Sequence, residues 1–310
     1  MKKNYLALLF AGLIAYAIPT NVTAQQTDWC LSETLFQQKA AQDPSVRLNR
    51  EQLDRETEQY VSKHQNQNPN QKSTSVVKII PVVFHIIHEG GSENISEAQI
   101  IDQLDSLNKD FRRQNADTVD TPAPFKPLAA DCEIEFRLAQ LDPNGNCTNG
   151  ITRHFSHLTN DARDNIKSFD YWPSNKYLNI WVVKTIENTQ ATSGFIIGYA
   201  QFPGGSALTD GVVLKYDWVG SIGTAASNGG YGRTAPHEVG HWLNLRHIWG
   251  DATCGSDLVA DTPTQNVNQS NCPNFPKIDT QCNNGPNGAM FTDYMDYTND
   301  GCINLFTEGQ

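Results

Sequence analysis

The sequence contains no run of Lys or Arg longer than a pair. Its 34 acidic residues outnumber its 23 basic residues, which gives a formal net charge of -11. Phosphate backbones and anionic membrane surfaces both select clustered Lys and Arg. We therefore expect neither a nucleic acid nor a membrane among the partners of this chain. No internal repeat is present either, so the chain is not a repeat array.

Long apolar runs are also missing, except for one at the extreme N-terminus. There, two lysines precede a stretch of about fourteen mostly apolar residues, and the small residues Val22 and Ala24 follow. This order is typical of a signal peptide over residues 1–24, with a buried hydrophobic helix as the alternative. Cleavage after Ala24 would leave Gln25 rather than a cysteine, which argues against a lipid anchor. We expect a secreted, soluble protein.

Aromatic residues are scarce between residues 25 and 75, where Gln, Asn, Lys and Glu dominate and the tract HQNQNPNQKSTS closes the segment. Such a segment cannot bury much surface, so we expect it to be weakly structured or an appendage. At Val76 the composition changes to VVKIIPVVFHIIH, which predicts a buried strand despite Pro81. The boundary of the folded domain should lie at roughly residues 72–76.

The rest of the chain carries enough apolar residues for a core, because 38% of the 310 residues are hydrophobic. A helix should follow Ser96, which has Gln99 three residues further on in a capping-box arrangement. The apolar face of this helix should contain Ile100, Ile101, Leu104, Leu107 and Phe111. Four further strands and a second helix are predicted from apolar runs between turn residues: strands at 133–140, 177–184, 194–201 and 211–216, and a helix at 236–246.

These elements predict an α/β protein of the α+β type, with a twisted, open and mostly parallel sheet. From residue 250 onward Gly, Asp, Asn, Thr and Pro dominate, and no periodicity is visible. This irregular C-terminal part must be held by something other than a large core. Its four cysteines are the natural candidate.

The motif HEVGHWLNLRH occupies residues 237–247. His237 and His241 are four residues apart, so on a helix they project from one face and can bind one metal ion. Glu238 can reach a water on that metal without binding the metal itself. Zinc lowers the pKa of such a water to about 7, and a neighbouring carboxylate can pass its proton to a leaving amine. The motif therefore predicts metal-dependent peptide hydrolysis.

His247 becomes the third ligand only if the helix stops near Asn244 and the chain turns back toward the metal. Such a turn needs a residue that tolerates the left-handed region, where Gly is best and Asn next. The whole motif would arise by chance in a chain of this length roughly a few times in ten thousand. A buried helix with satisfied histidines and a zinc-binding but inactive protein are the alternatives. Glu238 argues against the inactive protein, because an inert site does not need that carboxylate.

The motif, together with Met295 in the downstream DYMDY, resembles the metzincin clan and specifically its pappalysin family. The similarity runs from about Val76 to the C-terminal FTEGQ and includes the GYAQFPG and DGVVLKY runs. It implies a metzincin-like catalytic domain over residues 73–310, with an active-site helix and a disulfide-bonded C-terminal subdomain. It also implies a pro-segment over residues 25–72.

The resemblance further assigns residues around the zinc. It implies that Met295 lies in a tight turn beneath the metal and that Tyr297 stabilises the tetrahedral intermediate, since a phenol can donate a hydrogen bond to an oxyanion. Tyr294 is a weaker candidate for that role, and packing is the alternative for either tyrosine. Asp300 could line the pocket for the residue after the scissile bond and attract Arg or Lys there, as acidic residues do in the family.

Seven cysteines follow the signal peptide, so at least one stays unpaired even in an oxidising compartment. By resemblance, the C-terminal half is tied by two disulfides, Cys254–Cys282 and Cys272–Cys302. A hairpin-like bridge between Cys132 and Cys147 is a further option. Cys30 is then left over in the pro-segment, and we hypothesise that its thiolate binds the zinc and keeps the precursor latent. A free or intermolecular thiol is the alternative.

The segment GDATCGSDLVADT at residues 250–262 offers carboxylates, hydroxyls and carbonyls of the kind that calcium prefers. The family binds structural calcium in this region, which makes Asp257, Asp261 and Thr262 candidate ligands. Solvated loop acids are the alternative.

The combined prediction is a secreted, monomeric, zinc-dependent endopeptidase that is made as a latent zymogen and acts on protein or peptide substrates. Two other classes remain open. One is a secreted binding or adhesion protein that keeps zinc structurally, for which a chelator-insensitive function would speak. The other is a zinc hydrolase of a non-peptide amide, which assays of proteins against small amides would separate.

Overall fold

The computed structural model of the chain describes residues 28–64, 76–188 and 195–310. The predicted signal peptide over residues 1–24 lies outside these ranges. Residues 65–75, which include most of the predicted domain boundary at roughly 72–76, lie outside them too. Within the described ranges no helix combines the length and apolarity that crossing a membrane requires. The described residues form four α-helices: α1 Ser32–Gln42, α2 Pro44–His64, α3 Glu97–Phe111 and α4 Thr234–Trp242. They also form six strands: β1 Lys78–His88, β2 Ile134–Leu138, β3 Ile151–Phe155, β4 Leu178–Val183, β5 Gly198–Ala200 and β6 Val212–Lys215.

The six strands form one mostly parallel sheet, as predicted, in the order β2-β1-β4-β6-β5. The long strand β1 pairs with β2 along its first half and with β3 along its second half, and with β4 on its other side. The short strand β5 is the antiparallel edge strand beside β6. Of the predicted strand at 194–201, only the three residues of β5 are regular strand.

Strand β3 was not among the predicted strands. Its sequence ITRHF is short and interrupted by polar residues, and Phe155 at its end is 69% exposed. The apolar signal is therefore too weak for a pattern-based prediction. Pairing to the second half of β1 supplies what the sequence pattern does not.

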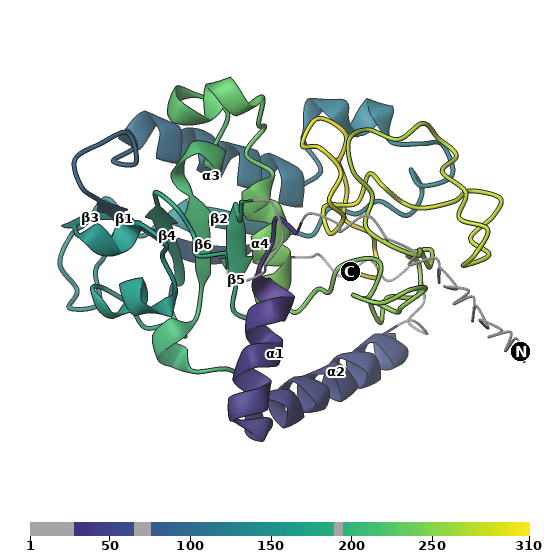
Figure 1. The fold of residues 1–310 in the computed structure, drawn as a ribbon, viewed down its shortest axis with the longest axis horizontal. Coiled ribbons are helices and arrows are strands. Elements are labelled where there is room, and N and C mark those ends of the chain that lie inside the picture. The colour runs from purple at the N-terminus through teal and green to yellow at the C-terminus, as the bar shows by residue number, and fades with distance from the viewer. Residues whose placement is uncertain (1–27, 65–75, 189–194) are drawn as a thin grey trace, which may run out of the picture.

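The main core lies between one face of the sheet and the helices α3 and α4. Phe84 and Ile86 of β1 point to this face together with Leu107 of α3 and Val239 of α4, and all four are fully buried. The opposite face is covered by a second apolar cluster around Trp181. Figure 1 shows the sheet on one side of the molecule, the yellow C-terminal segment on the other, and α4 between them.

Helix α3 begins after Ser96, whose Oγ accepts a hydrogen bond from the Gln99 N–H at 3.2 Å, as predicted. The reciprocal half of the capping box is absent, because the Gln99 side chain donates instead to the carbonyls of Tyr216 and Val219. The prediction for Ile101 was also wrong. Its side chain is 50% exposed and does not belong to the buried face.

The N-terminal segment was expected to be weakly structured, but its described part forms α1 and α2. Helix α1 runs away from the end of α4 and meets α2 at a sharp angle at its far end (Figure 1). Arg50 of α2 is 2% exposed and lies 3.6 Å from the ring centroid of Phe202, and Lys39 of α1 pairs with Asp164 at 2.6 Å. The polar composition misled the prediction, since the few residues that are buried pack against a distant part of the chain.

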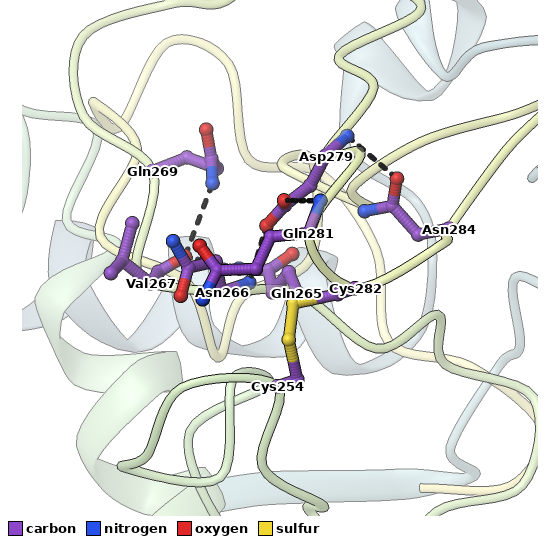
Figure 2. The surroundings of a disulfide bond; sticks show 9 residues. All are labelled: Cys254, Gln265, Asn266, Val267, Gln269, Asp279, Gln281, Cys282 and Asn284. Carbon is purple, nitrogen blue, oxygen red and sulfur yellow. Dashed lines mark hydrogen bonds between the residues drawn. A yellow bond between two sulfur atoms is a disulfide. The ribbon is translucent and has the colours of Figure 1, made fainter.

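The C-terminal part contains no helix or strand within the described residues 243–310, as its composition suggested. Both disulfides implied by the resemblance are present, Cys254–Cys282 and Cys272–Cys302. Figure 2 shows the first of them beside Asp279, which accepts a hydrogen bond from the Asn266 N–H and donates its own N–H to Asn284 Oδ1, both at 2.7 Å. Covalent links and side-chain hydrogen bonds thus hold this part.

The optional bridge between Cys132 and Cys147 is not formed, and both cysteines are free. Cys132 packs against the main core, whereas Cys147 is exposed. Cys147 follows a turn that closes on itself, because the carboxylate of Asp142 accepts hydrogen bonds from the N–H groups of Asn144 and Asn146. The turn is therefore complete without a covalent link.

Candidate active site and metal centre

Helix α4 brings the first two motif histidines together. His237 and His241 lie one turn apart on its buried side, and their Nε2 atoms are 3.1 Å apart. The Nε2 atom of His247 lies 3.1 Å from that of His241. All three rings are buried. The motif therefore converges on one point, as the sequence predicted.

The third histidine reaches this point through a turn at Asn244. The helix ends at Trp242 rather than at the predicted residue 246, and Asn244 has a φ of 81° in the left-handed region. The Leu245 N–H then donates to the carbonyl of Gly240 at 2.9 Å, which closes the helix end. Asn is the second-best residue for this conformation after Gly. The chain reverses here and carries His247 back to the other two rings.

Each histidine is oriented by a hydrogen bond on its other ring nitrogen. The Nδ1 of His237 donates to the carbonyl of Tyr294 at 2.7 Å, and that of His241 donates to the carbonyl of Leu245 at 2.8 Å. The Nδ1 of His247 lies 2.6 Å from Oδ1 of Asp251. A carbonyl can only accept a hydrogen bond, so Nδ1 carries the proton in the first two rings and Nε2 keeps its lone pair.

The electrostatics of His237 and His241 agree with this arrangement. Burial lowers the pKa of His237 to about 3 and the pKa of His241 well below its ordinary value. Burial also acts to lower the pKa of His247, but the neighbouring Asp251 carboxylate outweighs it and the pKa is raised. Neutral imidazoles with free Nε2 lone pairs are the form that binds metals.

The donor set fits a zinc ion. His237 and His241 present lone pairs to each other at 3.1 Å, a contact that no hydrogen bond satisfies and that a shared cation would. Two nitrogen ligands about 2.0–2.1 Å from a tetrahedral zinc lie roughly 3.3 Å apart, close to the observed separation. The Sγ of Cys30 completes a buried group of four donors whose ligand atoms all lie within 4.8 Å of one another.

The Glu238 carboxylate is fully buried beside this group and contacts the N-terminal segment. Its Oε2 accepts hydrogen bonds from Ser32 Oγ at 2.9 Å and from Cys30 Sγ at 3.4 Å, while Oε1 has no hydrogen-bond partner among the described residues. Burial raises the pKa of Glu238 to about 7, although the hydrogen bonds from Cys30 and Ser32 act in the opposite direction.

Ser32 was not among the predicted site residues. Its Oγ accepts a hydrogen bond from the Ala200 N–H at 2.8 Å and donates to Glu238, so it joins the edge strand β5 to the buried carboxylate. Nothing local in the sequence DWCLSE marks this serine, because its role depends on where the segment docks. The docking itself is backbone pairing: Ile197 N–H donates to the Trp29 carbonyl at 2.9 Å, and Leu31 N–H donates to the Gly198 carbonyl at 3.2 Å.

Met295 and Tyr297 both lie at this centre. Met295 is fully buried beneath α4, so close that a Cβ added at Gly240 would lie 2.4 Å from its Sδ. The ring of Tyr297 is 5.0 Å from that of His247, and its hydroxyl donates to the Cys30 carbonyl at 3.4 Å. Tyr294, the weaker candidate, points elsewhere, since its hydroxyl donates to Asp110 Oδ1 at 2.7 Å.

Comparisons with known proteins agree with this geometry. A family model described as pregnancy-associated plasma protein-A, a peptidase family, matches residues 160–310. Mature mirolysin of Tannerella forsythia, solved in complex with a cleaved peptide, is 48% identical, with 76% of this chain and 89% of that chain covered and a TM-score of 0.70. The chain belongs to the pappalysin family of metallopeptidases.

Further relatives of this pappalysin include a precursor and a fungal enzyme. A promirolysin mutant of Tannerella forsythia is 43% identical, with 92% of this chain and 91% of that chain covered and a TM-score of 0.75. An extracellular metalloprotease of Arthroderma otae is 26% identical over 238 residues, which cover 74% of each chain. The likeness to the precursor extends over more of this chain than the likeness to the mature enzyme.

Asp300 of this pappalysin lines the same cavity as the first motif histidine. The cavity, of about 30 Å³, is also lined by His237, Glu238, Tyr297 and Trp29 of the N-terminal segment. Burial raises the pKa of the Asp300 carboxyl.

The three candidate calcium ligands do not converge on one point. Thr262 Oγ1 contacts both carboxylate oxygens of Asp257, at 3.0 and 2.8 Å. Asp261 instead accepts hydrogen bonds from Thr307 Oγ1 at 2.7 Å and from the Gly309 N–H at 2.9 Å. Asp257 and Thr262 are thus adjacent, and Asp261 ties down the C-terminus.

A second cluster of His and Asp lies on the opposite face of the sheet from α4. It consists of His85, His154 and Asp170, with ligand atoms within 4.8 Å of one another. Hydrogen bonds account for this cluster: His85 contacts Thr152 Oγ1 at 2.8 Å and Asn179 Oδ1 at 3.0 Å, and His154 contacts Asp170 at 3.2 Å. We therefore assign it no metal.

Proposed function

We propose that the chain is a secreted zinc-dependent endopeptidase, made as a latent zymogen, in which Glu238 is the general base. The observation that carries this proposal is the buried Glu238 carboxylate beside the three motif histidines. The Nε2 atoms of His237 and His247 each lie 3.1 Å from the Nε2 atom of His241. Its membership of a metallopeptidase family and the extracellular metalloproteases among its relatives support it.

In this proposal His237, His241 and His247 hold the zinc. When bound, the ion acts as a Lewis acid toward the peptide carbonyl and lowers the pKa of the attacking water to about 7. Glu238 accepts a proton from that water through its carboxylate and returns it to the nitrogen of the leaving amine. Tyr297, freed from the Cys30 carbonyl, donates its hydroxyl hydrogen bond to the developing oxyanion. The burial of these groups excludes bulk water and strengthens each interaction.

Latency follows from the same contacts. Cys30 would supply the fourth ligand as a thiolate, which displaces the water, and Ser32 occupies the oxygen of Glu238 that would take the proton. The backbone pairing of Trp29 and Leu31 with residues 197–198 holds the segment in place. Removal of the segment would free the metal, the base and the pocket together.

The test of the catalytic assignment is Glu238→Ala, with variant and wild type made as the full chain and freed from the N-terminal segment in the same way before assay. We expect turnover to fall at least about 10³-fold, because the general base is removed, while zinc content stays at one per chain. Glu308→Ala, which removes an exposed glutamate, serves as the control and should keep normal turnover. Activity near the wild-type level in Glu238→Ala would refute the assignment.

The test of latency compares Cys30→Ser with Cys147→Ser, a second free cysteine that is exposed. The precursor of Cys30→Ser should cleave a peptide substrate before any processing, because the hydroxyl is a poor zinc ligand. The Cys147→Ser precursor should stay as inactive as the wild type. Equal latency in both variants would reject the role of Cys30.

We further propose that Asp300 favours Arg or Lys after the scissile bond. The support is its position in the cavity beside His237 and Tyr297. Mass spectrometry of cleavages in a peptide library measures this preference directly. Asp300→Asn should reduce it, and an unchanged preference would exclude Asp300 as its source.

A structural calcium ion remains part of the proposal, with Asp257 and Thr262 as its ligands; Asp261, the third candidate, is hydrogen-bonded to the C-terminus instead. The support is the contact of Thr262 with the Asp257 carboxylate, which gathers oxygen ligands at the start of the loop. Calcium added to chelated, zinc-reloaded protein should raise its melting temperature, and Asp257→Asn should abolish the rise. No rise in the wild type would remove calcium from the proposal.

A further inference from the structure

Arg233 is the N-cap residue of α4, and it lines the same cavity as Asp300. Its side chain is 4% exposed. A buried cation in this place would repel the Arg or Lys side chain that the proposed function assigns to the cavity. The proposed preference therefore needs a second acidic group that neutralises the charge of Arg233, so that the charge of Asp300 is not used for this.

Asp117 is that acidic group. Both of its carboxylate oxygens accept hydrogen bonds from the Arg233 guanidinium: Oδ2 from Nη1 at 2.5 Å and Oδ1 from Nη2 at 2.7 Å. This fork-to-fork geometry is the strongest that an arginine and a carboxylate can make. Asp117 belongs to a short 3-10 helix at Ala116–Asp120, far from α4 in the sequence.

The contacts between Arg233 and Asp300 are of a different kind. The guanidinium donates to the backbone carbonyls of Asp300 and Ile303, and the Asp300 carboxylate accepts through Oδ2 from the backbone N–H groups of Tyr231 and Arg233, both at 3.0 Å. Each side chain is thus hydrogen-bonded to the backbone of the other residue, and the guanidinium and the carboxylate are not hydrogen-bonded to each other. Among the described residues, no hydrogen bond reaches the second oxygen of Asp300.

The charges around the cavity do not balance. Among the described residues, three carboxyl groups lie around the Arg233 guanidinium: those of Asp110, Asp117 and Asp300, with Asp110 Oδ1 3.5 Å from Nη2. Tyr294 donates its hydroxyl to Asp110, so that carboxylate is already occupied. Of these three residues Asp300 lines the cavity, whereas Asp110 and Asp117 do not. The excess negative charge is therefore available where a substrate side chain would enter.

We propose that Asp117 is a positioning residue for specificity: it holds and neutralises the Arg233 guanidinium, so that the Asp300 carboxylate stays free for a cationic substrate side chain. This inference rests on the proposed function, which places that side chain beside Asp300. Without the charge of Asp117, the positive charge of Arg233 acts on Asp300 and competes with the substrate.

The experiment uses the full chain, activated in the same way for every variant, and peptides that differ only in the residue after the cut. The measured quantity is the ratio of kcat/KM for the Arg peptide to kcat/KM for the Leu peptide. Asp117→Asn should lower this ratio roughly tenfold and change kcat/KM for the Leu peptide little. Asp117→Glu, which keeps the charge, should restore most of the ratio. Asp120→Asn is the matched control, since it removes an exposed acid of the same short helix and should leave the ratio unchanged.

The double variant Asp117→Asn with Asp300→Asn separates the two ways in which an unneutralised Arg233 can act. A ratio equal to that of Asp300→Asn alone means that Arg233 acts through the charge of Asp300, and a lower ratio means that it also repels the cationic side chain directly; a higher ratio overturns the inference. A normal ratio in Asp117→Asn, with a reduced ratio in Asp300→Asn, overturns the inference and leaves the proposed function intact. An unchanged ratio in Asp300→Asn refutes the proposed specificity itself.

A second measurement does not depend on the folding of the Asp117 variants. If Asp117 neutralises Arg233, the pocket of Asp300→Asn carries no net positive field and should not select a Glu peptide over the Leu peptide. A gain of at least about tenfold for the Glu peptide would show that Arg233 is a free cation, and would overturn the inference.

Discussion

The sheet half of the molecule and its C-terminal half are held together by different means, although both contribute to the site. In the sheet half, apolar side chains such as Phe84 and Ile180 are fully buried in one continuous cluster. The C-terminal half adds apolar residues such as Met295 and Phe306 to this cluster, but it also buries many polar groups, among them Asp293 and Asp296. The first half carries His237 and Glu238 on a packed helix, and the second delivers His247 and Tyr297 on loops. Packing supplies rigidity in one half, and directed bonds supply it in the other.

Asp296 illustrates the second kind of support. Its carboxylate accepts hydrogen bonds from Gln265 Nε2 at 2.9 Å, from the Gln269 N–H at 2.7 Å and from the Tyr297 N–H at 2.8 Å. Burial raises its pKa to about 6, with these hydrogen bonds acting in the opposite direction. One carboxylate thereby fixes the backbone of Tyr297 to the distant segment that carries Gln265 and Gln269. A core residue would bury more area but could not specify these three positions.

The largest effect is expected from a change in the apolar cluster. Phe84→Ala should lower the free energy of unfolding by about 3–5 kcal/mol, because it leaves a cavity in a fully packed region. Hydrogen exchange should show lost protection in the sheet and in α4, since Val239 belongs to the same cluster. Phe155→Ala, at a position that is 69% exposed, is the control and should change stability by less than about 0.5 kcal/mol. A loss below about 1 kcal/mol in Phe84→Ala would contradict the role given to packing.

A smaller and more local effect is expected from the disulfide in Figure 2. The pair Cys254→Ser and Cys282→Ser should lower stability by about 3.5 kcal/mol, because the bond closes a loop with a sequence separation of 28 residues. Hydrogen exchange should show lost protection between the two positions and unchanged protection in β1 and β4. Cys147→Ser, which removes an exposed free thiol, is the control. Lost protection across the sheet would erase the distinction between the two halves.

The sequence predicted what depends on neighbouring residues. Apolar runs gave β1, β2, β4 and β6, because a buried parallel strand needs continuous apolar residues wherever it lies. Spacing gave His237, His241 and Glu238 as one cluster, because helix geometry fixes their directions. The left-handed turn at Asn244 was predictable for the same reason, since few residue types tolerate it.

What depends on distant partners was not predictable. The helices α1 and α2 bury few of their own residues, and their support comes from contacts such as Arg50 on Phe202. Ser32 contacts Glu238 only because the segment docks on β5. The Gln99 side chain does not make the expected capping contact, because it donates to two carbonyls more than a hundred residues away. A composition window cannot contain such partners.

The stability that the contact between the two halves contributes should depend on pH. Asp110 of α3 accepts a hydrogen bond from Tyr294 of the C-terminal half, and burial raises its pKa to about 6 despite the nearby Arg233. The folded state therefore holds this proton more tightly than the unfolded chain, where Asp titrates near 3.9. The resulting stability is complete below about pH 4 and is lost as the pH rises through about 6.

Stability curves of the wild type and Asp110→Asn between pH 4 and pH 7 test this. The wild type should lose roughly 2–3 kcal/mol relative to the variant as the pH rises across that window. Asp105→Asn removes an exposed acid from the same helix and serves as the control. A difference between wild type and Asp110→Asn that does not change with pH would show that Asp110 is not held in this way.

The smallest effect is expected where the two halves meet covalently, at Asn244. Its φ of 81° strains any side chain with a Cβ, and Asn tolerates it best after Gly. Asn244→Ala should therefore lower stability by about 1 kcal/mol, and Asn244→Gly should stay within about 0.5 kcal/mol of the wild type. Thermal unfolding of the zinc-loaded chain measures both. Asn244 Nδ2 also donates to Asp54 of α2 at 3.0 Å, so both variants lose the same contact with the N-terminal segment. If Ala and Gly are equally destabilising, that contact, and not the turn, is what the residue provides.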